Sequence, residues 1–340
     1  MLLAIDLIFG YQILRIISNE TSDYHRIRDK NYHHSLLPLV RLEDRWGDNY
    51  YNLCTDINGF RISCVVKDQK LNEESDQIII IGDSFTEGLG VEYEDTFAGR
   101  IDFYMNQYNV KNLGVSSYSP SIYYSKILKH SSEFNRLKEV YVFIDISDIQ
   151  DEAQFYTLSS DGTVFDKGRD VKDYNFKRGL FNLFPVIYSV LDRIKIKILS
   201  SDKKQILSKE EYNIRSAWTW MDGFEYGGLG TKGGIDQATQ SMQKLSTFLE
   251  SKDVELSVVV YPWPDQIKYG TVNSKQVQIW KNFCEGRCKN FIDAFPEFFK
   301  LKKEFNIDYV LNKYYLSGDV HFSKAGHELI SSIVLKKMTE

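Results

Sequence analysis

Residues 78–90 read IIIIGDSFTEGLG, and this stretch decides the fold. Four consecutive isoleucines are β-branched and apolar on both faces, which is typical of a central parallel strand covered by helices on each side. The apolar run stops at Gly82-Asp83-Ser84, and a helix-like segment follows. Ser84 is therefore expected at the carboxyl end of the strand, where open α/β sheets bind ligands. The helix that follows would offer free backbone N–H groups at the same place.

Strand-like and helix-like apolar spacings alternate along much of the chain. Alternation of this kind is typical of right-handed β-α-β units and a parallel sheet. We therefore predict an α/β fold with three layers, α/β/α, around a central, mainly parallel sheet. Further strands are expected at residues 110–115, 140–146 and 256–261, and helices at about 120–138 and 237–250.

The predicted domain spans residues 76–340, and an insertion at about residues 152–232 breaks its alternation. The insertion contains polar turns and a glycine-rich loop, so we interpret it as a segment that shapes a substrate cleft or forms a lid. The glycines lack the spacing and the Lys-Ser/Thr ending of a phosphate-binding loop. Residues 19–75 mix polar and aromatic residues and are expected to form a leader that packs against the domain.

A carboxylate and an imidazole stand two residues apart near the C-terminus, at Asp319 and His321. In an extended backbone, residues i and i+2 project to the same side. Asp319 can then hold the Nδ1–H of His321 and leave Nε2 free to accept the proton of Ser84, as a nucleophile, base and orienting acid require. Taken alone, Ser84 could cap a helix, Asp319 could be a turn residue and His321 could bond a backbone carbonyl. The occurrence of all three in this order favours catalysis.

With both ends considered, the chain resembles the SGNH (GDSL-type) hydrolase superfamily, whose serine block reads GDS and whose C-terminal block carries the catalytic Asp and His. Two intermediate blocks are similar as well, NLGVSSYS at residues 112–119 and VFIDISDIQD at residues 142–151. The four blocks occur in the family's order over most of the chain. The resemblance implies a flavodoxin-like SGNH hydrolase fold with Ser84, Asp319 and His321 as catalytic residues.

The same resemblance implies an oxyanion hole made by the N–H groups of Ser84 and Gly114 and by the side chain of residue 147. The family has an asparagine at the third position, whereas this chain has Ser147. A serine hydroxyl can donate one hydrogen bond, but it is shorter and can rotate away. Because loss of an oxyanion donor typically lowers turnover by about 10²–10³, we expect slower chemistry or a donor from another residue.

These motifs predict a serine esterase that hydrolyses an O-acyl or O-acetyl ester through an acyl-enzyme on Ser84. By resemblance, the ester is expected on a carbohydrate or another cell-envelope molecule, with no cofactor and no metal. Two alternatives stay open: an O-acetyltransferase that uses the same triad on a glycan, and a non-catalytic glycan-binding or assembly protein. Trp218, Trp220 and Tyr226 in the insertion are candidate carbohydrate contacts.

Charge and the N-terminal segment bear on partners and localisation. The formal net charge of −5 and the scattered basic residues argue against a nucleic-acid partner. Residues 1–18 are largely apolar but contain Asp6 and Arg15, and they are slightly short of the roughly 20 residues that span a membrane.

Three interpretations of residues 1–18 remain open: a membrane anchor, an interfacial amphipathic helix, and a soluble helix packed on the domain. Because the chain looks most like bacterial SGNH proteins with an N-terminal anchor, we expect membrane attachment with an extracytoplasmic catalytic domain. Basic residues after the apolar segment argue mildly for the alternative, a cytoplasmic domain. The sequence does not indicate an oligomeric state.

Four cysteines lie outside the motifs, at Cys54, Cys64, Cys284 and Cys288. Each pair of sequence neighbours flanks a short loop, so two local disulfides are conceivable in an oxidising compartment. Four unpaired thiols are the equal alternative. No histidine pair stands at ligand spacing from these cysteines, so a zinc site is not expected.

Overall fold

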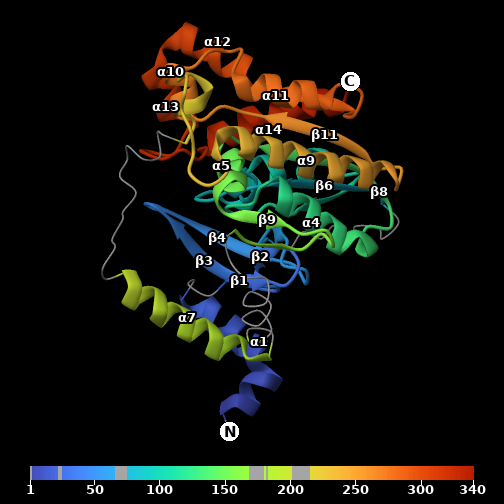
Figure 1. Cartoon of the computed structure of the whole chain (residues 1–340), viewed down its shortest axis with the longest axis vertical. Coiled ribbons are helices and arrows are strands. Elements are labelled where there is room, and N and C mark those ends of the chain that lie inside the picture. Colours follow the sequence, from blue (N-terminus) through green and yellow to red (C-terminus); the bar gives the residue numbers. More distant parts are fainter. Residues whose placement is uncertain (1, 22–24, 66–74, 168–179, 181–182, 201–214) are drawn as a thin grey trace.

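The computed structural model describes residues 2–21, 25–65, 75–167, 180, 183–200 and 215–340. Parts of the predicted leader and of the predicted insertion therefore lie outside the described residues. The described part is built around one eight-stranded sheet (Figure 1). Its five parallel strands are β6 (Gln77–Gly82), β7 (Asn109–Asn112), β8 (Leu137–Ile144), β11 (Glu255–Val260) and β12 (Asn290–Asp293).

The parallel strands follow the order β7-β6-β8-β11-β12. Numbered along the chain this order is 2-1-3-4-5, that of flavodoxin-like doubly wound sheets, so the predicted fold class is confirmed. The isoleucine strand β6 lies inside the sheet, and Ile79, Ile80 and Ile81 are fully buried. A strand apolar on both faces therefore lies where both faces are covered.

Helices cover both faces of the sheet. Right-handed crossovers place the helix between β6 and β7 on the face opposite to the helices between β7, β8 and β11, because the strand order reverses at β6. Contacts agree: α3 packs with α14, whereas α4 and α5 pack with α9. The helices are α3 (Phe97–Tyr104), α4 (Pro120–His130), α5 (Ser147–Gln154), α9 (Gly230–Glu250), α11 (Lys275–Cys284) and α14 (Lys324–Met338).

Shorter elements complete the main body. The helices α2 (Ser84–Glu87), α10 (Pro264–Tyr269), α12 (Phe295–Phe305) and α13 (Ile307–Tyr314) lie in the connections. Three 3-10 turns are η1 (Tyr93–Asp95), η2 (Ser131–Glu133) and η3 (Ala217–Thr219).

The N-terminal part of the chain enlarges the sheet. Strands β3 (Arg41–Trp46), β4 (Asn49–Thr55) and β5 (Arg61–Ile62) are antiparallel and join β7 through the pair Arg61 and Asn112. We call β3, β4 and β5 the antiparallel extension. A separate hairpin, β1 (Arg26–Asp29) with β2 (His33–Leu36), precedes it. These strands bring residues from the start of the chain to the edge of the sheet at which Ser84 lies.

The described part of the predicted insertion contains a hairpin, β9 (Tyr156–Leu158) with β10 (Val164–Asp166), and the helix α7 (Pro185–Ser200). Trp218 and Tyr226 are only 5% and 7% exposed. They belong to the hydrophobic core, so the prediction that these two side chains contact carbohydrate is wrong. Trp220 is half-buried and pairs with the exposed ring of Tyr269.

Helix α1 (Leu2–Thr21) packs against α7 and also contacts β3, at the end of the antiparallel extension (Figure 1). The carboxylate of Asp6 accepts the backbone N–H groups of Val186 and Ile187 at 3.0 and 2.8 Å. Asp6 therefore caps the first turn of α7, which explains an acid within an apolar segment. Among the described helices, none combines the length and apolarity needed to cross a membrane, so the predicted anchor at residues 1–18 is not supported.

The cysteines form two local disulfides, Cys54 with Cys64 and Cys284 with Cys288. The first bridge ties β4 to the residues that follow β5. The sequence left open two disulfides or four free thiols, and the structure has the two disulfides.

Candidate active site

Ser84 is the first residue of α2 and follows β6 after one intervening residue. The Asp83 carboxylate accepts the N–H of Phe85 at 3.0 Å and so caps α2. The turn requires glycine at position 82, because a Cβ there would lie 2.1 Å from Thr86 Oγ1. This tight strand-to-helix junction holds a buried serine hydroxyl at the carboxyl edge of the sheet.

The structure brings Ser84, His321 and Asp319 into one chain of hydrogen bonds. His321 Nε2 lies 2.8 Å from Ser84 Oγ, and His321 Nδ1 lies 2.5 Å from Asp319 Oδ1. Asp319 Oδ1 also accepts the backbone N–H of His321 at 2.9 Å. The two residues are therefore joined by a turn closed through the Asp319 side chain, not by the extended backbone that we expected.

Trp46, at the end of β3, supports the acid. Its Nε1–H donates to Asp319 Oδ2 at 3.0 Å. Burial acts to raise the pKa of Asp319, but hydrogen bonds from His321 and Trp46 outweigh it and lower the pKa to about 2. Asp319 is thus an anion at neutral pH. Sequence reasoning missed Trp46, because nothing local marks a tryptophan 273 residues away as a partner of the acid.

Two aromatic rings fix the imidazole. The rings of Phe85 and Trp46 lie with their centroids 4.9 and 5.0 Å from that of His321. The second histidine of the C-terminal block, His327, has a different role. Its Nδ1 accepts the N–H of Phe97 at 3.2 Å, and burial lowers its pKa to about 3. His327 is therefore a neutral, structural residue.

Gly114 lies close to α2, but its N–H is already bonded. The N–H donates to Asn112 Oδ1 at 3.0 Å. A Cβ at this position would lie 2.6 Å from Thr86 Cβ and 2.8 Å from the backbone nitrogen of Glu87. The glycine is therefore required for the close approach of the loop to α2.

Ser147 is the first residue of α5, and both its N–H and its hydroxyl donate to Asp145 Oδ1 at 2.7 Å. The hydroxyl is therefore directed to a carboxylate. The Ser84 N–H differs from the other two predicted oxyanion donors. Because Ser84 begins α2, its N–H has no hydrogen-bond acceptor within that helix.

The loop after β7 contains a backbone outlier that sequence reasoning missed. Ser117 is exposed and has a φ of 62°, in the left-handed region that non-glycine residues seldom adopt. Such outliers gather at functional sites, but a serine gives no sequence signal for a positive φ. The preceding residue, Ser116, donates its N–H to Glu87 Oε2 at 2.7 Å and so ties this loop to α2.

Glu87 connects α2 to the N-terminal hairpin. Arg26 Nη1 and Nη2 lie 2.9 and 2.5 Å from the two oxygens of the fully buried Glu87. Burial acts to raise the pKa of Glu87, but Arg26 and the N–H of Ser116 outweigh it and lower the pKa. Helix α2, which carries Ser84, is thereby held from two sides.

A cleft of about 380 Å³ borders Asp319. Its walls come from the start of α10, from α13 and from the loop before His321, and include Pro264, Leu311 and Tyr315. This volume falls within the range of small-molecule sites.

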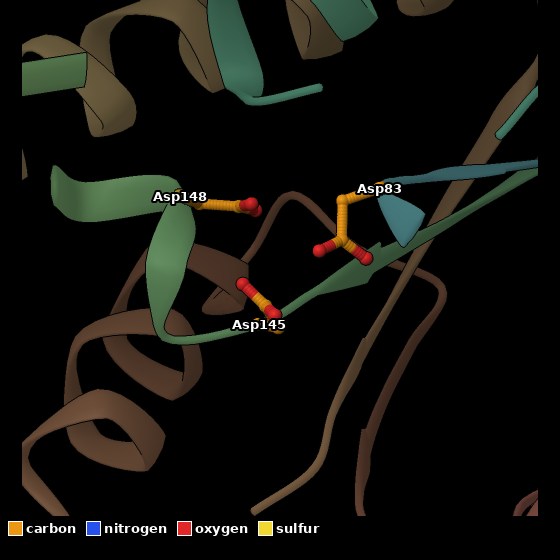
Figure 2. A group of neighbouring side chains, drawn as sticks. All are labelled: Asp83, Asp145 and Asp148. Atoms are coloured by element: carbon orange, nitrogen blue, oxygen red, sulfur yellow. The ribbon is translucent and has the colours of Figure 1, made fainter. Parts of the chain in front are cut away.

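Three carboxylates lie together beside Ser84. Asp83, Asp145 and Asp148 point toward one another from the end of β6, the end of β8 and the start of α5 (Figure 2). All three are buried, and one oxygen of each lies within 4.8 Å of the others. Burial, followed by the charge of Asp145, raises the pKa of Asp83 and of Asp148 well above the ordinary value. Among the described residues, these three form the group of His, Cys, Asp or Glu side chains that lie close enough together to hold a metal ion.

Comparison with known proteins gives loose structural likenesses. A member of the lipolytic G-D-S-L family from Veillonella parvula is 14% identical with a TM-score of 0.43, over 78% of this chain and all of that one. Axe2, an acetylxylan esterase from Geobacillus stearothermophilus, is 13% identical with a TM-score of 0.40, over 78% and 94%. A putative G-D-S-L lipolytic protein from Desulfitobacterium hafniense is 12% identical with a TM-score of 0.39, over 76% and 98%.

No family model matches the chain, and neither does any curated protein.

Proposed function

We propose that this chain is a serine esterase of the SGNH type that hydrolyses an O-acyl or O-acetyl ester. The observation that carries the proposal is the 2.8 Å contact between Ser84 Oγ and His321 Nε2, with Asp319 behind the imidazole. A hydroxyl, an imidazole and a carboxylate in this order are what nucleophilic catalysis on an ester requires.

In the proposed reaction, Ser84 Oγ attacks the ester carbonyl while His321 Nε2 accepts the hydroxyl proton. Asp319, which also accepts the N–H of Trp46, holds the tautomer and stabilises the imidazolium. His321 then gives the proton to the leaving alcohol, and an acyl-enzyme remains on Ser84. Water, deprotonated by His321, attacks the acyl carbonyl; the carboxylic acid leaves and Ser84 regains its proton.

The Ser84 N–H is the donor that we propose for the oxyanion in this conformation. To take the roles predicted for them, the N–H of Gly114 would have to leave Asn112, and the hydroxyl of Ser147 would have to leave Asp145. A site with fewer donors would be slower, since each one typically contributes about 10²–10³ to turnover.

As the substrate class we propose an O-acyl or O-acetyl group on a carbohydrate or another cell-envelope molecule. The sequence resemblance supports this proposal. The cleft of about 380 Å³ beside Asp319 is of a size for a small acyl group or one sugar unit.

The test is labelling with a serine-directed fluorophosphonate, followed by mass mapping of the modified peptide. Labelling of the wild type on residue 84, and none of Ser84→Ala, is the expected result. Ser332→Ala, which removes an exposed hydroxyl from α14, serves as the matched control and should label normally. A folded wild type that takes no label would contradict the proposal and favour a non-catalytic glycan-binding or assembly protein.

Hydrolysis and transfer are separated by a second assay. A hydrolase releases acetate from an acetyl ester whether or not a glycan is present, because water completes the reaction. Acetylated glycan as the main product, with little acetate released in its absence, would instead indicate an O-acetyltransferase with the same triad.

A further inference from the structure

The three carboxylates beside Ser84 have no cationic partner among the described residues. Asp145 and Asp148 are fully buried, Asp83 is 2% exposed, and none of the three forms an ion pair within the described ranges. The nearby guanidinium of Arg215 donates instead to Asp151 Oδ1 at 2.6 Å. The charge of Arg215 acts on Asp83 and Asp145 without direct contact. Three buried acids that no cation contacts are costly, because burial removes their hydration.

The surrounding donors orient these carboxylates. Asp145 accepts three hydrogen bonds, two from Ser147 at 2.7 Å and one from Trp263 Nε1 at 2.8 Å. Asp148 Oδ2 accepts the hydroxyl of Tyr123 at 2.9 Å. Hydrogen bonds of this kind fix the ligating carboxylates of metal sites.

Two polar atoms near the carboxylates lack hydrogen-bond partners. Asp148 Oδ1 is buried and accepts no hydrogen bond within the described part of the chain. Tyr261 is 0% exposed, and its hydroxyl, which lies close to Asp83, makes no hydrogen bond of normal geometry to a described residue. Buried polar atoms seldom lack partners, so these two favour a ligand at the cluster.

We propose that Asp83, Asp145 and Asp148 bind a hard divalent cation, with Ca²⁺ as the best fit. Carboxylate and hydroxyl oxygens are the ligands that such cations prefer. With Ca²⁺–O distances of 2.3–2.6 Å, two ligands of one ion can lie up to about 5 Å apart. The three oxygens lie within 4.8 Å of one another, so one Ca²⁺ can contact all three carboxylates.

An ion at this site would change the surroundings of Ser84. Asp83 Oδ2 lies 3.2 Å from Ser84 Oγ and competes with His321 for its hydroxyl proton. A bound cation withdraws electron density from Asp83 and so leaves the hydroxyl to His321. This consequence depends on the proposed esterase function, but the binding itself does not.

The test is titration of the EDTA-treated full chain with Ca²⁺ alone, followed by calorimetry and by thermal unfolding. We expect one Ca²⁺ per chain and an increase in Tm of about 5 °C at saturation, because the ion binds only the folded state. Binding should be the same in Ser84→Ala. The result is then independent of whether the chain is an esterase.

Two variants tie binding to the cluster. Asp148→Asn should abolish both the heat of binding and the Ca²⁺-dependent shift in Tm, because it removes a ligand carboxylate. If Asp148→Asn does not fold, Asp145→Asn tests the same loss of binding. Asp222→Asn removes an exposed acid that pairs with Lys275 and should bind Ca²⁺ normally.

Binding of Mg²⁺ that the same variants abolish would also support the site, and would assign it the smaller cation. The proposal is overturned if neither ion binds the folded chain at about 10 mM, well above the ~1 mM of weak calcium modules. It is equally overturned if binding survives in both Asp148→Asn and Asp145→Asn.

Discussion

Trp46 Nε1 lies 3.0 Å from Asp319 Oδ2, although 273 residues separate the two along the chain. Trp46 ends the first strand of the antiparallel extension, whereas Asp319 lies just before the last helix. The extension is therefore more than a cover for the sheet edge, because it provides a hydrogen bond to the acid of the candidate triad.

Trp46→Phe tests this hydrogen bond. The variant keeps a ring against His321 but removes the N–H that helps to hold the pKa of Asp319 near 2. We expect kcat on a p-nitrophenyl ester to fall about tenfold with little change in KM, the equivalent of one hydrogen bond to a charged group. The control is Trp280→Phe, whose buried N–H has no partner in the described part. Equal kcat for both variants would contradict the role of Trp46.

His321→Ala removes the proposed base. Turnover of the same ester should fall by at least about 10², since general bases typically contribute 10²–10⁴. His327→Ala is a useful contrast, because that imidazole accepts a backbone N–H. Its loss should lower Tm and leave turnover close to that of the wild type. A near-normal rate for folded His321→Ala would exclude it as the base.

Asp319 makes stability depend on pH. Its pKa in the folded chain, about 2, is below the ordinary value of 3.8, so its contribution is fully present above about pH 4 and is lost as the pH falls toward 2. Because the side chain is 30% exposed, we expect Asp319→Asn to lower the free energy of unfolding by about 1–2 kcal/mol at pH 7.

Urea unfolding of the wild type and Asp319→Asn at pH 7 and near pH 2.5 measures this contribution. The difference in the free energy of unfolding should shrink at the lower pH, and a difference that stays constant would show that the charge of Asp319 is not its source. The exposed Asp222→Asn should show no difference at either pH.

Ser147→Ala distinguishes a structural hydroxyl from an oxyanion donor. Because the hydroxyl donates to Asp145, we expect esterase turnover to stay within about threefold of the wild type, whereas loss of a true donor costs about 10²–10³. Turnover of p-nitrophenyl acetate measures the effect. A fall of 10² or more would return Ser147 to the oxyanion hole as the sequence predicted.

Arg26→Met tests the contact between the N-terminal hairpin and α2. The change leaves the carboxylate of Glu87 buried without its cation, which typically costs 3–5 kcal/mol; since Arg26 is 34% exposed, we expect about 3 kcal/mol by urea unfolding. Adding Glu87→Gln should recover part of this loss, because no buried charge then remains. If the double variant is no more stable than the single one, the ion pair is not the cause.

Local patterns in the sequence predicted the sheet and pointed to Ser84, Asp319 and His321, which the structure joins by hydrogen bonds. Four isoleucines can be buried on both faces only in a covered strand, and the residue that ends such a strand must lie at its carboxyl edge. Asp319 and His321 are two residues apart, so any compact turn keeps them together. These features depend on periodicity and short spacing, which a sequence displays directly.

Tertiary structure alone decided three other features of the site. These are the hydrogen-bond partners of Gly114 and Ser147, the contact of Trp46 with Asp319, and the proximity of Asp83 to Asp145 and Asp148. Asp83 and Asp145 were visible in two separate motifs, yet nothing in either motif shows that β6 and β8 are neighbours in register. Strand order and helix packing set the distances between residues that are far apart in the sequence. Side chains can then form hydrogen bonds only with the atoms that the fold places nearby.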